Sequence, residues 1–145
     1  MNVEDTIVAV SSPPGSALRG IVRLSGCDSL RIAEAVFKSD AADGWQADKT
    51  NRCVRGGVRV ADADLPGMML VFHAPKSYTR QDMVELHTLG AATILGMIVD
   101  ACLQAGARRA NAGEFTARAF LAGAMGADQI QGVAAMISAR SDSEL

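Results

Sequence analysis

The apolar residues of this chain change their period several times, and this feature restricts the fold more than any other. β-branched or alternating runs typical of strands occur at 6–10, 21–24, 55–60, 68–73 and 82–87. Helical spacing occurs at about 28–38, from 91 to 106, at 113–121 and at 128–140. Because strands and helices are interspersed, we predict an α+β fold, with a mixed β-sheet and helices packed against it.

The connecting segments are rich in turn residues. The pattern predicts a loop at 11–15, a surface loop containing Trp45 at 39–51, and a hairpin whose turn covers 61–67. A glycine turn at Gly90 and a short strand at 107–110 complete the prediction, and Asp28 or Ser29 is expected to cap the first helix.

Composition favours one compact domain outside the membrane. The chain has 145 residues, 49% of them apolar, enough for one core but not for a second full-sized domain. Sixteen acidic and fourteen basic residues give a net charge of −2, and no basic stripe typical of a nucleic-acid surface is visible. No apolar run reaches the ~20 residues that span a bilayer, and the acidic start lacks the basic region of a signal peptide. We expect a cytoplasmic protein without membrane contact.

Motifs for metal binding and catalysis are missing from the sequence. Cys27, Cys53 and Cys102 are widely spaced without CxxC, so we interpret them as small apolar residues rather than disulfide or zinc ligands. No phosphate-binding G-x-x-x-x-G-K-[ST], no G-x-G-x-x-G and no Gly-x-Ser-x-Gly occurs. We therefore predict no catalytic residues, no metal site and no GTP hydrolysis by this chain alone.

The strongest candidates for ligand contacts are Arg23 and Glu85, both within strands. Period-two alternation puts Arg23 opposite Val22 and Leu24, and puts Glu85 on one face with His87, which could orient it. Ligands often bind near strand ends and helix N-termini. By residues alone, however, a solvated arginine and an exposed carboxylate are the commoner explanation.

A helix start at 113–116 offers a further carboxylate. Glu114 would complement the positive end of the helix dipole, and Phe115 would anchor the helix to the core. We expect both roles to be structural.

Three stretches together resemble one family. They are Asp5-Thr6-Ile7-Val8-Ala9 with Pro13-Pro14-Gly15 and Ile21-Val22-Arg23-Leu24-Ser25-Gly26, then Ser77-Tyr78-Thr79 with Asp82-Met83-Val84-Glu85-Leu86-His87, then Gly113-Glu114-Phe115-Thr116-Ala117-Arg118-Ala119-Phe120-Leu121. Their order and spacing resemble the N-terminal domain of the tRNA-modification GTPases of the MnmE (TrmE) family.

The resemblance implies a GcvT-like folate-binding domain, similar to the aminomethyltransferases of glycine cleavage. It implies a folate-binding and dimerisation domain at 1–121 and the start of a central helical domain at 122–145. The implied cofactor is a reduced folate, 5-formyl- or methylene-tetrahydrofolate, which supplies a one-carbon unit for the wobble uridine of tRNA. Arg23 and Glu85 match the family's folate-contacting arginine and glutamate.

The resemblance also implies partners. It implies a homodimer, and contacts with tRNA and the flavoprotein MnmG through the full-length protein. GTP, Mg²⁺ and K⁺ would belong to a GTPase domain that this chain does not include. The stop at Leu145 would make the chain an expressed fragment or a shortened relative, and the sequence leaves both open.

Departures from the family pattern favour an alternative. Ala124 stands where the family has a folate-contacting lysine, and Leu89, Ala91, Arg80 and Ala112 replace other family residues. Loss of one charge-assisted hydrogen bond lowers affinity by roughly ten- to a hundredfold. The alternative is thus a degenerate dimerisation scaffold that no longer binds folate. A stand-alone aminomethyl-transfer protein would need a second folate-fold domain.

Overall fold

A computed structural model describes residues 2–15, 17–40 and 49–138, the side chains of 133–138 excepted. Its strands are β1 (Ile7–Val10), β2 (Ala17–Ser25), β3 (Phe37–Ser39), β4 (Arg52–Val60), β5 (Ala63–Phe72), β6 (Met83–Gly90) and β7 (Arg108–Arg109). Its helices are α1 (Ser29–Val36), α2 (Ala92–Gln104), α3 (Glu114–Leu121) and α4 (Ala127–Ser138). The loop containing Trp45 falls largely outside the described residues.

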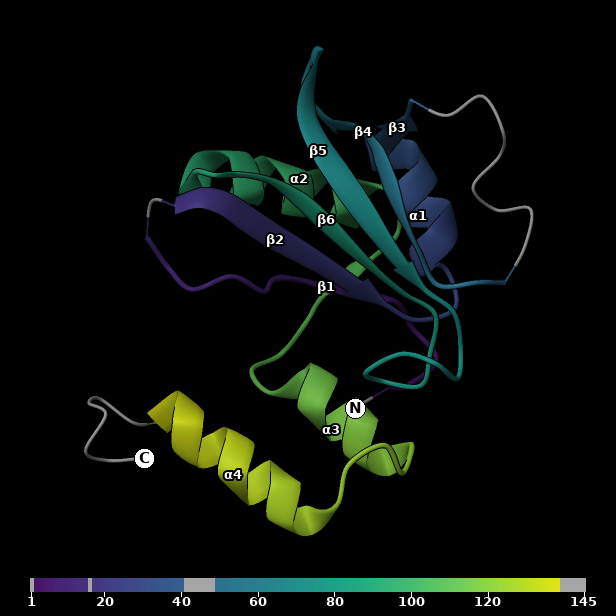
Figure 1. The fold of residues 1–145 in the computed structure, drawn as a ribbon, viewed down its shortest axis with the longest axis vertical. Coiled ribbons are helices and arrows are strands. Elements are labelled where there is room, and N and C mark those ends of the chain that lie inside the picture. Colours follow the sequence, from purple (N-terminus) through teal and green to yellow (C-terminus); the bar gives the residue numbers. More distant parts are fainter. Residues whose placement is uncertain (1, 16, 41–48, 139–145) are drawn as a thin grey trace.

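One seven-stranded sheet organises the molecule, in the order β3-β4-β5-β6-β2-β1-β7 (Figure 1). Neighbouring strands are antiparallel, except that β1 and β7 are parallel. The long β4–β5 hairpin extends beyond the rest of the sheet. The predicted α+β class with a mixed sheet is confirmed.

The core lies between one face of the sheet and helices α1 and α2, which pack against it and against each other (Figure 1). The predicted alternation in the central strands is confirmed, because every second side chain is fully buried. These side chains are Val22, Leu24, Val84 and Leu86. They meet Ile32 of α1 and Ile98 of α2. The intervening side chains therefore project from the opposite face.

The first helix is shorter than predicted. It ends at Val36 rather than 38, and Phe37 has an extended backbone (φ −134°, ψ 133°) that starts β3. Phe37 pairs with Val58 of β4, and this strand pairing replaces the helical conformation that its apolar spacing predicts. Ser39, the first residue of the predicted loop at 39–51, is therefore the end of a strand. Asp28 occupies the N-cap position, but its side chain makes no capping bond and pairs with Arg31 instead (Nε–Oδ1 3.3 Å).

The hairpin is tighter than predicted. Its turn is Ala61–Asp62 alone, with Ala61 at φ 51°, because Val60 already pairs with Ala63. The predicted turn at 61–67 is wrong, since Pro66 belongs to β5. Pro66 is tolerated because this part of β5 pairs with β4 but not β6, which leaves one edge without ladder bonds.

The start of β2 and the end of β6 also differ from prediction. β2 starts at Ala17 instead of 21, and Gly90 ends β6 rather than forming a turn. A Cβ on Gly90 would lie 2.5 Å from the carbonyl oxygen of Ala17, so glycine is needed there for close strand approach.

Helices α3 and α4 lie together, away from α1 and α2, and α3 lies near the loop that joins β5 to β6 (Figure 1). Gly113 precedes α3 with a left-handed backbone (φ 71°) that glycine adopts easily. The predicted helix at 113–121 is confirmed. For α4, residues 139–140 and the side chains of Val133, Ala134 and Ile137 fall outside the described residues.

The interpretation of the cysteines as small apolar residues fits the burial of one of the three. Cys102 is fully buried in the core, whereas Cys27 and Cys53 are exposed. All three thiols are free. Among the residues that the structure describes, no helix is both long and apolar enough to cross a membrane.

Candidate functional site

An open cavity of about 870 Å³ lies on the sheet face opposite α1 and α2. Its walls come from β2, the end of β5, β6, the loop at 73–82 and the segment just after α3. Arg23, Glu85 and Ala124, the three residues singled out from the sequence, all line it. The fold thus brings together positions about one hundred residues apart.

Arg23 and Glu85 form an ion pair at the centre of this face. They lie directly opposite each other on β2 and β6, so their side chains project side by side. Nη2 and Nε of Arg23 lie 2.7 and 2.9 Å from Oε1 of Glu85. The side chains are 27% and 12% exposed, so the pair is half-buried yet open to the cavity.

His87 engages the other oxygen of the same carboxylate. Its Nε2 lies 3.0 Å from Oε2 of Glu85, two residues earlier on the same strand face. A carboxylate offers about four acceptor sites, and these contacts use three of them. Arg23 keeps N–H groups that Glu85 does not engage. The Arg23–Glu85 pair is therefore held in one orientation before a ligand binds. Glu85 can still accept a hydrogen bond from a ligand, and Arg23 can still donate one.

Two aromatic rings lie beside Arg23, one from the loop at 73–82 and one from α3. Its Cζ lies 5.9 Å from the ring centroid of Tyr78 and 5.8 Å from that of Phe115. The Tyr78 hydroxyl is 3.1 Å from Oγ1 of Thr116, which ties the loop at 73–82 to α3. Phe72 adds an apolar wall to the cavity. A planar ligand could stack among these groups.

A buried charge network fixes α3 beneath the sheet. Arg118, 2% exposed, pairs with Asp5 and Glu114, and Arg108 bridges the same two carboxylates at 2.8 and 2.7 Å. Arg118 also donates to Oε1 of Gln81, at 3.1 Å. The network joins the N-terminal segment, β7, α3 and the loop at 73–82, and so positions Phe115 against Arg23.

The network changes the pKa values of its acids. Hydrogen bonding from Arg108 lowers the pKa of Glu114 to about 2, although burial opposes this shift. Hydrogen bonding from Arg108 also lowers the pKa of Asp5, burial opposes this shift, and Arg118 adds to the lowering. Both carboxylates are consequently charged at neutral pH. Glu114 is therefore an ion-pair partner as well as a helix-start residue. Its partner Arg118 was not predicted from the sequence.

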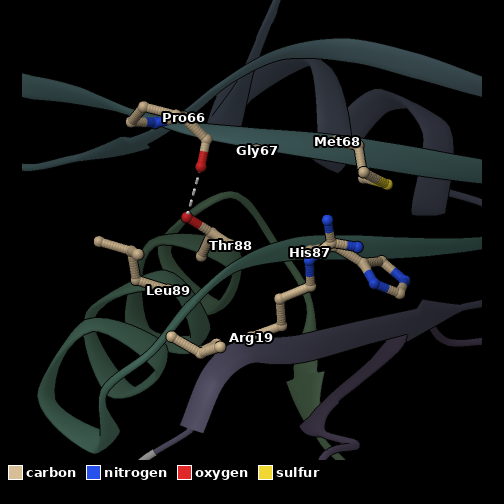
Figure 2. Close-up of a pocket in the computed structure, with 8 residues that line it drawn as sticks. Arg19, Pro66, Gly67, Met68, His87, Thr88 and Leu89 are labelled. Carbon is tan, nitrogen blue, oxygen red and sulfur yellow. Dashed lines mark hydrogen bonds between the residues drawn. The ribbon is translucent and has the colours of Figure 1, made fainter.

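A second, smaller cavity of about 270 Å³ lies between the start of β2, the middle of β5 and the end of β6 (Figure 2). Figure 2 shows the Thr88 hydroxyl donating to the carbonyl oxygen of Pro66, at 3.0 Å. His87 lines this cavity while its Nε2 contacts Glu85 in the larger one. Leu18 and Leu89, at 93% and 49% exposure, make its rim apolar.

Several cavity residues were not predicted as ligand contacts from the sequence. Lys76, Tyr78 and Arg80 belong to the loop at 73–82 and line the larger cavity. The sequence signal was partial, because Tyr78 lies within one of the three stretches that carry the family resemblance. Lys76 and Arg80 lie on a turn without regular periodicity, so no pattern predicts their direction.

Comparison with known proteins identifies the family of this chain. Residues 6–124 match the family described as the N-terminus of the GTP-binding protein TrmE. Proteins named tRNA modification GTPase MnmE are 41% identical over 142 residues in Francisella philomiragia, 38% over 146 in Acaryochloris marina, and 36% over 151 in Thermus thermophilus.

The aligned regions cover 98%, 95% and 98% of this chain, but only 30%, 31% and 33% of those relatives. The chain thus spans about a third of the length of the relatives it matches. Both comparisons concern the same N-terminal region, and the chain therefore belongs to the TrmE N-terminal family, the N-terminal domain of tRNA modification GTPase MnmE.

Proposed function

We propose that this domain binds a reduced folate in the larger cavity and dimerises, as part of a tRNA-modification GTPase. The observation that supports this most strongly is the half-buried Arg23–Glu85 pair facing a cavity of about 870 Å³. Sites for small molecules commonly measure 300–1,000 Å³, with a few oriented polar groups on apolar walls.

The chemistry of the cavity suits a folate. The carboxylate of Glu85 can accept parallel N–H bonds from a pterin ring, and the guanidinium of Arg23 can donate to a carbonyl or carboxylate. Tyr78 and Phe72 offer apolar surface to the ring system. When bound, the folate would supply the one-carbon unit, while the protein residues would bind and orient it. A GcvT-like origin of the fold is part of the same proposal.

Other activities belong to the longer relatives. Those proteins are named tRNA modification GTPases, and this chain spans about a third of them. We therefore assign GTP, Mg²⁺ and K⁺, tRNA and MnmG to the full-length protein, acting in the cytoplasm. Within this chain we propose the folate-binding domain at 1–121 and the start of a helical domain at 122–145.

The second cavity supports the dimerisation proposal. Leu18 on β2 is 93% exposed and Leu89 on β6 is 49% exposed, and both line this cavity. Exposed leucines grouped at a hollow are typical of protein interfaces. We propose that a second copy of this chain covers them.

Calorimetric titration of 5-formyltetrahydrofolate tests the folate proposal. We expect micromolar binding by the wild type and a loss of about tenfold or more in Glu85→Gln, because a charged acceptor is removed. Glu34→Gln, on the exposed side of α1, is the matched control and should bind normally. Absence of heat up to millimolar ligand would contradict folate binding.

Sedimentation equilibrium tests the dimer proposal. Leu18→Asp should shift the protein to monomer, because a charge would be buried in the interface. Leu121→Asp, which changes a 64% exposed leucine on α3, should leave the dimer intact. A wild-type monomer at high micromolar concentration would argue against this surface.

One observation favours a scaffold without ligand as the second candidate function. Ala124 lines the cavity without any charge, where the family resemblance implies a folate-contacting lysine. In that case the protein would still dimerise, and the titration would give no heat. The two experiments together therefore separate the candidates.

A further inference from the structure

The larger cavity carries positive charge that no carboxylate in the described part of the chain neutralises. Its charged lining residues are Arg23, Lys76, Arg80 and Glu85. Arg23 and Glu85 neutralise each other at 2.7 Å. Among the described residues, neither Lys76 nor Arg80 has a carboxylate within ion-pair distance. The cavity therefore has two uncompensated cations on one wall, which favours an anionic ligand.

Arg80 occupies a backbone conformation that most residues avoid. Its φ is 57°, in the left-handed region where a side chain is disfavoured and glycine is not. In the described part of the chain, the other non-glycine residue with positive φ is Ala61, in the hairpin turn. Unfavourable backbone geometry at a cavity wall is often retained for function.

The turn that carries Arg80 is held on several sides. The amide of Arg80 donates to the carbonyl of Ser77 at 3.3 Å, and the Ser77 hydroxyl donates to the carbonyl of Gln81. Nη2 of Arg80 lies 3.5 Å from the carbonyl oxygen of Gly123, which is a long hydrogen bond. The guanidinium thus lies beside Ala124, the position that lacks a cation of its own.

Lys76 lies on the same anchored loop. Nδ2 of Asn51 donates to the carbonyl of Lys76 at 2.7 Å, and the amide of Ala74 donates to Oδ1 of Asp82 at 2.9 Å. Between the two cations in sequence is Tyr78, whose ring lies 5.9 Å from Cζ of Arg23. One part of the cavity therefore offers the carboxylate of Glu85 and the ring of Tyr78. Another part offers the cations of Lys76 and Arg80.

We propose that Lys76 and Arg80 form an anion subsite that binds the carboxylates of the ligand, with Arg80 as the main specificity-determining residue. The subsite selects ligands with a carboxylate tail over the same ring system without one. This proposal rests on the proposed function for the ring system, but the subsite can be tested apart from it.

The first arm titrates 5-formyltetrahydrofolate, whose glutamate tail carries two carboxylates. Arg80→Gly should weaken binding about three- to tenfold, because the lost cation is solvent-exposed and screened. The same variant should raise the Tm by a few degrees, because glycine relieves the left-handed strain. Arg80→Lys should keep most of the affinity, and Arg55→Ala, an exposed arginine outside the cavity, should keep all of it.

The second arm uses p-aminobenzoylglutamate, which has the tail but no pterin ring, followed by NMR of the backbone amides. Millimolar probe should shift amides at 76–80 in the wild type and in Arg55→Ala, but not in Arg80→Gly. These shifts should weaken at high salt. Unchanged spectra up to tens of millimolar, or equal shifts in Arg80→Gly, would overturn the subsite. If the probe behaves as expected and the folate does not bind, the subsite stands and the folate proposal fails.

Discussion

The buried guanidinium of Arg118 donates to both the main-chain oxygen and the carboxylate of Asp5, 113 residues earlier in the chain. The main-chain bond measures 2.8 Å, and further bonds reach Asn2 and Gln81. This one side chain thus attaches α3 to the N-terminal segment and to the loop that forms the cavity wall. It should contribute strongly to stability.

Replacing Arg118 by methionine should lower the free energy of unfolding by about 3 to 5 kcal/mol, because the carboxylates lose a buried partner. Urea denaturation measures this change. Arg109→Met is the matched control: Arg109 pairs with Asp100, but both side chains are more than 60% exposed, at 63% and 62%. The control should change stability by less than about 1 kcal/mol. Equal effects of the two substitutions would contradict a structural role for the network.

Stability should fall in acid. The folded-state pKa of Glu114 is about 2, below its ordinary 4.5. Stability from this group is therefore full above pH 4.5 and is lost as pH falls toward 2, up to about 3 kcal/mol. The lowered pKa of Asp5 acts in the same direction. Urea denaturation across this pH range should show that the free energy of unfolding falls steeply with decreasing pH in the wild type. It should fall less steeply in Glu114→Gln. A slope unchanged by that substitution would refute this assignment.

The three cysteines should differ in reactivity. Burial raises the pKa of Cys102 to about 12, whereas Cys27 and Cys53 are exposed. Iodoacetamide at neutral pH should thus modify Cys27 and Cys53 and spare Cys102 in the native protein, because a buried thiol forms little thiolate. Peptide mass spectrometry reads this out, and unfolding in urea should make all three react. Rapid native labelling of Cys102 would show that α2 opens readily.

Alternation predicted the faces of the central strands because β2 and β6 have one buried and one open face. Val22 and Leu86 point into the core while Arg23 and Glu85 point away, as the period of two requires. The pairing of β2 with β6, which places Arg23 opposite Glu85, did not follow from periodicity. Sequence patterns define faces, whereas register depends on contacts between distant segments.

The element boundaries that were predicted wrongly depend on contacts between distant segments. Phe37 is extended and not helical because β4 offers it a strand partner. Pro66 can lie in a strand because β6 does not pair with this part of β5. Arg118 has no local feature that distinguishes it from a solvated helix arginine. Its burial depends on Asp5, which no local pattern could predict.

His87 should position Glu85 for ligand binding. Its Nε2 lies 3.0 Å from Oε2 of Glu85, while Arg23 engages Oε1, so removing the ring frees one carboxylate oxygen to rotate. His87→Ala should weaken 5-formyltetrahydrofolate binding by about three- to tenfold, measured by calorimetry.

His87→Gln separates this positioning role from simple packing, because its amide can still donate to the carboxylate. We expect it to recover most of the affinity, with the wild-type Tm as a check that both variants remain folded. If alanine and glutamine weaken binding equally while folding is intact, the contact between His87 and Glu85 does not position the carboxylate. If neither weakens binding, Arg23 alone is sufficient to orient Glu85 across β2 and β6.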